Sequence, residues 1–136
     1  MSAAIVTDQA KADMMREVLR EPCMLRLYVN EVGPSPISSD FVEPDGGGYG
    51  PKPMRSDLWD TTNAPVIASY PLQLWHFARV ANEKLDMIVR GYFITRNSDD
   101  RLRWFEPLPG GPMRVVNDGD QVKIAPHLSF AAPQEG

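Results

Sequence analysis

The chain has 136 residues and a formal net charge of −4, with 43% hydrophobic and 24% charged residues. This balance is typical of an ordinary folded protein, and a chain of this length is expected to form one domain around one core. The 13 prolines and 10 glycines favour many turns over long helices. Because the balance is acidic and the basic residues are dispersed, we expect no nucleic-acid partner.

A single cysteine, Cys23, excludes an internal disulfide and fits a chain made in a reducing cytoplasm. No histidine or basic cluster adjoins it, so a small buried residue is a better interpretation than a reactive thiol. No apolar run approaches the roughly 18 residues of a membrane span. The N-terminus also lacks the basic start and apolar segment of a secretory signal. We therefore expect no membrane partner.

One helix is predicted, over residues 8–20. Thr7 or Asp8 is a suitable N-cap, and Pro22 ends the helix. Residues spaced four apart give it an apolar stripe, formed by Met14, Val18, Met15 and Leu19. We expect this stripe to pack on a sheet or on a neighbouring subunit rather than to bind a ligand.

Short segments of alternating or β-branched composition follow the helix, separated by turn signals every 8–12 residues or so. They are residues 24–30, 56–59, 66–68, 70–77, 85–95, 102–105, 113–116 and 122–130. The pattern predicts an all-β fold with one N-terminal α-helix, a β-sandwich with jelly-roll or Greek-key-like connections. We therefore divide the chain into an arm and helix over residues 1–22 and a β-sandwich domain over residues 23–136.

Within this pattern, residues 89–95 and 102–105 read as an antiparallel hairpin, and Gly91 fits a bulge or a close backbone contact. Three prolines after Phe105 are expected to end the second strand. Asn117–Asp120 (NDGD) is the strongest turn signal of the chain, because Asp-Gly readily supplies positive φ.

Residues 43–55 form a Gly/Pro-rich loop that contains the run PDGGGYGPKP. A phosphate-binding loop would need a Lys-Ser or Lys-Thr pair after its last glycine and then a helix, and neither follows. We interpret the loop as an exposed connection between strands that reaches a neighbouring subunit.

No catalytic or metal-binding pattern is visible. The two histidines, His76 and His127, lack the spacing of metal ligands, and pairing either one with Cys23 is not specific. Most aspartates fall in turns, where they accept backbone hydrogen bonds. The three tryptophans allow an exposed aromatic platform, but their strand-like context favours core packing at Trp59, Trp75 and Trp104. We predict no enzyme activity and no cofactor.

Three motifs carry a family resemblance. They are Leu-Arg-Leu-Tyr-Val-Asn at residues 25–30, Gly-Tyr-Phe-Ile-Thr at residues 91–95, and Asn-Asp-Gly-Asp at residues 117–120 with aliphatic residues and Pro126 after it. The chain resembles small virion proteins of tailed bacteriophages, across nearly its whole length but at low density. Arg90 stands where a tyrosine is common in those proteins. The motifs are structural, so they specify a fold better than a role.

The resemblance implies a capsid cement or decoration protein, made in the host cytoplasm and located on the capsid surface of the virion. Its partners would be the major capsid protein and further copies of itself, as a dimer or trimer. Sheet edges would allow strand addition, and the helix and loops would reach neighbouring subunits. The candidate interface residues are Met14, Met15, Val18, Leu19, Phe41, Tyr49, Pro51 and Pro53. A tail or head-completion protein and a carbohydrate-binding sandwich used in host attachment are the alternatives.

Overall fold

The computed structural model describes residues 4–81 and 84–129. Within them the chain is mostly β, with one N-terminal α-helix, α1 (Asp8–Arg20), as the sequence predicts. Two short 3₁₀ helices, η1 (Ser38–Asp40) and η2 (Ser56–Leu58), lie in connections. The strands are β1 (Cys23–Tyr28), β2 (Lys52–Met54), β3 (Ala68–Ser69), β4 (Gln73–His76), β5 (Met87–Val89), β6 (Gly91–Arg96), β7 (Leu102–Pro107), β8 (Met113–Val115), β9 (Gln121–Ile124) and β10 (His127–Leu128).

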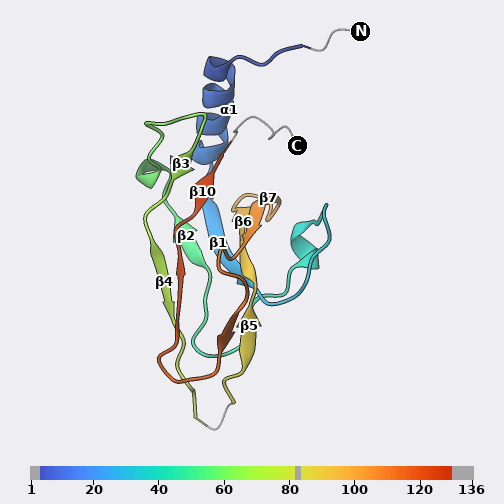
Figure 1. The fold of residues 1–136 in the computed structure, drawn as a ribbon, viewed down its shortest axis with the longest axis vertical. Helices are drawn as coiled ribbons and strands as arrows, with labels where there is room; N and C mark the ends of the chain where they lie inside the picture. Colours follow the sequence, from blue (N-terminus) through green and yellow to red (C-terminus); the bar gives the residue numbers. More distant parts are fainter. Residues whose placement is uncertain (1–3, 82–83, 130–136) are drawn as a thin grey trace.

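Helix α1 begins and ends where local chemistry places its ends. The Thr7 side chain accepts a hydrogen bond from the Ala10 amide at 3.1 Å, which confirms Thr7 as the N-cap. Glu21 is already extended, and Pro22 follows it. The buried face of α1 packs beside β3 in a small cluster that also contains Trp59, Trp104 and Leu128. Figure 1 shows the helix standing at one end of the long axis, with β1 running from its base.

The strands pair in a nested order. One sheet has four antiparallel strands in the order β2-β1-β6-β7. The remaining strands form the antiparallel pairs β3–β10, β4–β9 and β5–β8. Strands early in the chain therefore pair with strands late in the chain, and the pairing closes inwards to the β6–β7 hairpin, which the sequence predicts.

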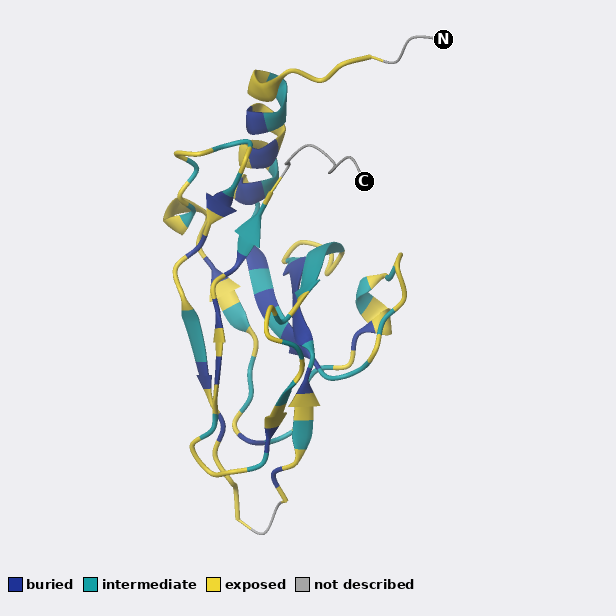
Figure 2. Ribbon diagram, in the orientation of Figure 1, coloured by how far each residue is buried: buried dark blue, intermediate teal, exposed yellow. Residues whose placement is uncertain are grey.

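The main core lies between the four-stranded sheet and the β4–β9 and β5–β8 pairs. It joins side chains from β1, β4, β5, β6, β8 and β9, including Leu25, Leu27, Trp75, Ile94 and Val122. Residues 91–95 of β6 are all buried, because its other face packs on an aromatic cluster of Tyr28, Phe41 and Phe93. Figure 2 shows this concentration of buried residues in the middle of the molecule. The strand pattern predicted half-buried strands, so the two-sided burial of β6 is a correction.

Several predicted strands differ from the structure. Residues 56–58 form η2 instead of a strand, and Leu58 is exposed. The Leu58 amide donates to the Arg55 carbonyl at 3.2 Å, which closes a 3₁₀ turn in place of a strand ladder. An exposed ion pair of 2.7 Å between the Arg55 and Asp57 side chains lies beside this turn.

Of the strand predicted over residues 66–68, only Ala68 lies in a strand, β3. The single strand predicted over residues 85–95 is interrupted at Arg90, and its two halves, β5 and β6, join different partner strands. The strand predicted over residues 122–130 is divided at Pro126 into β9 and β10, which pair with different strands. Of this last predicted strand, Phe130 lies outside the described residues.

The close backbone contact predicted at Gly91 is confirmed. A Cβ atom at this position would meet the Glu106 carbonyl oxygen, the Tyr28 hydroxyl at 2.7 Å and the Pro107 Cα at 2.8 Å. Strand β7 continues to Pro107, two residues beyond the predicted end, because Pro107 is the last residue paired with β6 and needs no amide there.

Candidate interaction surface

The structure divides the predicted helix stripe between the core and the surface. Met15 and Leu19 are buried against the chain's own strands, so they are not accessible to another subunit in this fold. Val18 is half-buried, while Met14 is 48% exposed. The residue spacing predicted correctly that apolar residues recur along the helix. In the structure, however, Met15 and Leu19 face the core, whereas Met14 faces the solvent. Only the Met14 side is accessible to a partner.

The arm before the helix carries the most exposed large hydrophobic side chain among the residues that the structure describes. Ile5 is 91% exposed and Val6 is 44% exposed, in an extended segment that leaves the free end of α1 (Figure 1). The helix pattern did not single these two residues out, since they precede it. The sequence signal that could have identified them is an isolated Ile-Val pair just before the N-cap.

The predicted loop residues are also divided. Phe41 is buried in the aromatic cluster, stacked on Phe93 with ring centroids 4.3 Å apart. Tyr49 is half-buried and packs against the main core. Pro51 and Pro53 are exposed, and Pro53 lies in the middle of β2. The segment over residues 43–55 is therefore partly a sheet strand, which corrects the expectation of an exposed loop.

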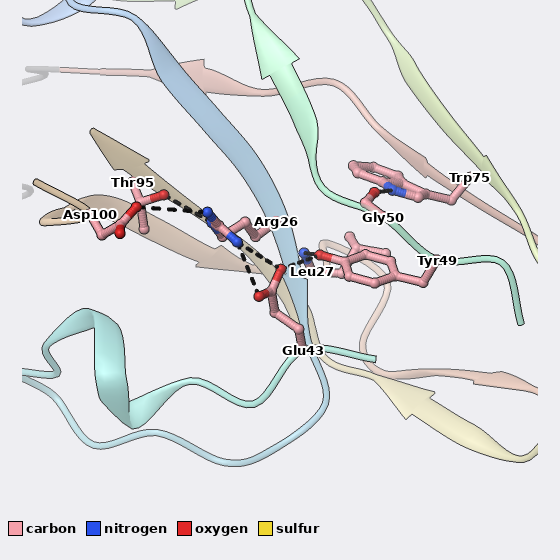
Figure 3. A network of polar contacts seen from close by, with 8 residues as sticks. All are labelled: Arg26, Leu27, Glu43, Tyr49, Gly50, Trp75, Thr95 and Asp100. Atoms are coloured by element: carbon pink, nitrogen blue, oxygen red, sulfur yellow. Dashed lines mark hydrogen bonds and ion pairs between the residues drawn. The ribbon is translucent and has the colours of Figure 1, made fainter. Parts of the chain in front are cut away.

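A partly buried polar network fixes this segment to β1 (Figure 3). The Tyr49 hydroxyl donates to Glu43 Oε1 at 2.6 Å and accepts from the Leu27 amide at 3.1 Å. Burial raises the pKa of the Tyr49 hydroxyl far above its usual value, and its hydrogen bond to the Glu43 carboxylate raises it further. The hydroxyl stays protonated and serves as a permanent bridge between the loop and the strand.

The Arg26 guanidinium extends the same network across the sheet. Its Nε donates to Thr95 Oγ1 at 3.0 Å, and its Nη1 donates to Glu43 Oε2 at 3.1 Å. A weaker contact at 3.9 Å joins its Nη2 to the exposed carboxylate of Asp100. Nearby, the Trp75 indole donates to the Gly50 carbonyl at 2.9 Å (Figure 3). These bonds tie Glu43, Tyr49 and Gly50 to strands of the same chain, so we assign the network a structural role.

An apolar groove of about 390 Å³ opens at the Tyr28 end of β1. We call it the Tyr28 groove; its lining includes Tyr28, Val32, Arg90, Phe105, Pro107 and Leu108. One cation stands in it, the Arg90 guanidinium, which donates to the Val29 carbonyl at 3.3 Å. Its only acidic neighbour among the described residues is Glu31, at 3.8 Å, and that side chain is 87% exposed. Glu31 also lines the groove, so the groove combines apolar surface with one cation and one exposed carboxylate in contact at 3.8 Å.

The two edges of the four-stranded sheet carry features that oppose strand addition. On β2, Pro53 provides no amide hydrogen. On β7, the pairing with β6 shifts register between Ile94 and Thr95, and Pro107 ends the strand. Bulges and prolines are common devices that keep an edge from pairing with another chain. The expectation that sheet edges provide the contacts is therefore not favoured, and side-chain surfaces are the better candidates.

The two histidines lie outside the network, and each has a polar neighbour. His76 Nδ1 lies 3.2 Å from Gln121 Nε2, and His127 Nε2 lies 2.9 Å from Glu106 Oε2. Within residues 4–81 and 84–129, no group of three or more His, Cys, Asp or Glu side chains is placed to hold a metal ion. Burial raises the pKa of the Cys23 thiol, which agrees with the prediction of a small buried residue.

Several aspartates hold turns, as the sequence predicts. Asp120 accepts from the Val116 and Asn117 amides, and these bonds lower the pKa of its carboxyl. The Arg96 guanidinium, 2.7 Å away, lowers the pKa of Asp99 to about 2. Each of these two carboxylates stabilises the turn in which it lies.

The tryptophans belong to the core rather than to an open platform. Trp75 is buried, and Trp59 is half-buried between Tyr70 and Trp104, with ring centroids 5.0 and 5.8 Å away. The helical part of the described chain contains no segment long and apolar enough to cross a membrane.

No protein-family model matches the sequence, and no significant match is found among curated proteins or among solved structures. A functional assignment therefore rests on the chain's own motifs and geometry.

Proposed function

We propose that this protein is a structural component of the virion of a tailed bacteriophage, a capsid cement or decoration protein that binds the outer surface of the major capsid protein shell. The observation that carries the proposal is a β-rich fold with accessible apolar sites at separate places on its surface. These sites are the arm with Ile5 and Val6, the exposed side of α1 at Met14, and the Tyr28 groove. Exposed apolar sites rimmed by polar residues are typical of protein–protein contacts.

We also propose that the strands form a β-sandwich of the jelly-roll kind. The nested pairs β3–β10, β4–β9, β5–β8 and β6–β7 support this, because a jelly roll is a long antiparallel ribbon whose two arms fold together. A core shared between the four-stranded sheet and the β4–β9 pair supports it as well. Such a body keeps its loops in fixed positions, which suits a protein that links neighbouring subunits.

Several small sites serve a cement protein better than one large site. Each contact is weak alone, but a protein held at one site meets the next at a high effective concentration. Homo-oligomers multiply this effect, because every copy adds its own set of contacts. The partly buried network of Arg26, Glu43 and Tyr49 contributes by removing flexibility that binding would otherwise have to restrict.

The experiment that tests this function is a measurement of copy number in purified virions by quantitative mass spectrometry. We expect on the order of hundreds of copies per particle, since a cement protein follows the repeating capsid lattice. About a dozen copies would instead assign the protein to the tail or head-completion machinery. Absence from particles of a phage that encodes the chain would overturn both assignments.

A further inference from the structure

We propose that the N-terminal arm of one copy, residues 4–7, binds in the Tyr28 groove of a second copy. The inference deepens the proposed assembly role by naming a partner and the surface it uses. It concerns contact between two copies in solution and requires no capsid.

The arm has the chemistry of a segment that binds elsewhere. Ile5 and Val6 are β-branched residues that favour extended structure, and the described arm is extended and exposed. Transfer of an isoleucine side chain from water into an apolar site is strongly favourable. Asp8 follows within two residues and is exposed at the first turn of α1. The arm therefore presents an apolar pair next to a carboxylate.

The groove offers the complementary arrangement. Tyr28, Phe105 and Leu108 provide apolar surface, and Arg90 provides the cation at the rim. Glu31 also lines the groove, but its side chain is 87% exposed and its carboxylate lies 3.8 Å from the guanidinium, which leaves room for a second carboxylate to approach Arg90. A contact made by side chains in a groove needs no free sheet edge. It therefore agrees with the bulge and the prolines that protect the edges of the four-stranded sheet.

The arm cannot reach the groove of its own chain. Helix α1 has 13 residues and spans about 20 Å at roughly 1.5 Å per residue. Strand β1 has six residues, spans about another 20 Å, and runs from the base of α1 (Figure 1). Its last residue, Tyr28, lines the groove. Four extended residues reach about 14 Å at most. Helix α1 and strand β1 follow one another along the long axis (Figure 1), so the start of α1 and the groove lie roughly 40 Å apart. An arm that binds in the groove therefore comes from another copy.

This separation also determines the kind of assembly. The arm and the groove are different surfaces at different places on the molecule, so their contact joins unlike patches. Such heterologous contacts form a closed ring when the rotation between copies closes, and an open chain when it does not. The arm-to-groove contact accordingly agrees with a ring, including the trimer that the resemblance implies, and with a dimer only if two arms are exchanged.

The test is sedimentation of the full chain over a range of concentrations, with point variants. Removal of residues 1–22 would expose the core around Met15 and Leu19, so single substitutions are cleaner. Ile5→Asp places a charge on a side chain that is 91% exposed, and the fold should tolerate it. We expect self-association of the native chain to weaken about tenfold to a hundredfold in this variant.

Leu72→Asp is the matched control, because Leu72 is 60% exposed and lies outside the arm and the groove. It should leave self-association unchanged. Equal effects of the two substitutions, or a native chain that is monomeric throughout the concentration range, would overturn the proposal.

A cross-linking measurement then identifies the site. Two single variants, Ile5→Cys and Val32→Cys, are mixed and treated with a short bismaleimide. We expect a cross-linked dimer containing one chain of each variant, and no such product when Leu72→Cys replaces Val32→Cys. Cross-linking that favours the Leu72→Cys partner would contradict docking in the groove.

These results are separable from the proposed function. Failure of self-association leaves the virion copy number still to be measured, because a monomer can also bind a capsid. Conversely, a ring that is absent from virions would retain the arm-to-groove contact and remove the capsid role.

Discussion

At the scale of single residues, Gly91 allows three strands to approach one another closely. It pairs with Tyr28 on one side and with Pro107 on the other, where no side chain would fit. The sequence predicted this close contact because a glycine inside a strand pattern often marks a bulge or a close backbone approach. The identity of the neighbouring atoms was not predictable, since they come from segments far apart in the chain.

We predict that Gly91→Ala destabilises the fold by about 3 kcal/mol or more, in the upper range for overpacked sites. The added methyl group would overlap the backbone of β7, which cannot move without breaking the β6–β7 pairing. Urea unfolding followed by tryptophan fluorescence measures the change.

Gly33→Ala is the control for this substitution, because nothing lies within 4 Å of a Cβ atom at Gly33. It should change the free energy of unfolding by about 0.5 kcal/mol or less. Similar midpoints for the two variants would contradict the steric account of Gly91.

At the scale of elements, local features were predictable and long-range ones were not. The N-cap at Thr7 and the stop at Pro22 lie within a few residues of the helix, so α1 was predictable. The segment over residues 43–55 resembles an exposed loop by composition. Its order comes from Leu27 and Arg26, which are distant in sequence, and no local pattern indicates them.

The Tyr49 hydroxyl takes the place of a strand partner just beyond the last residue pair of β1 and β2. Leu25 is the last residue of β1 that pairs with β2, at Lys52, so the Leu27 amide has no strand partner on that side. The hydroxyl accepts the hydrogen bond in place of a backbone carbonyl. A side chain from the glycine-rich segment thus takes over a role of the backbone.

We predict that Tyr49→Phe lowers the free energy of unfolding by about 1–3 kcal/mol, the usual cost of leaving a buried polar group without a partner. Hydrogen exchange by NMR should show faster exchange of the Leu27 amide. The Val122 amide in β9 is the internal control, since it belongs to a different sheet. Unchanged protection of Leu27 relative to Val122 would show that the hydroxyl is not needed there.

At the scale of the whole molecule, the sequence predicted the class of fold but not which strands pair. Short strands separated by turns indicate an all-β protein, yet the alternation is the same for any pairing order. The pairs β4–β9 and β5–β8 join residues far apart in the chain. The turn at Asn117–Asp120 illustrates the difference, because it connects β8 and β9, and these strands pair with others. Prediction of the candidate interface residues was limited in the same way. The sequence pattern does not show which of them the folded chain buries and which it leaves exposed.

Tyr92 links the two ends of the nested strands. It lies in β6, and its hydroxyl contacts the backbone of His127 in β10, 3.4 Å from the amide nitrogen and 3.5 Å from the carbonyl oxygen. Burial raises the pKa of Tyr92 to about 12, compared with about 10 in an unfolded chain. The folded state therefore holds the proton more tightly than the unfolded state does. Its contribution to stability is fully present below about pH 10 and is lost as the pH rises through about 12.

We predict that Tyr92→Phe reduces the loss of stability between about pH 10 and pH 12, because phenylalanine has no proton to release. Other groups also titrate there, so the quantity to compare is the difference in free energy of unfolding between the variant and the native chain, with about pH 8 as the reference. That difference should shift in favour of the variant as the pH rises, by up to about 2 kcal/mol. A difference that stays constant from about pH 8 to pH 12 would mean that Tyr92 ionises as readily in the folded chain as in the unfolded one. The strand ends would then be open to water at the β6–β10 contact.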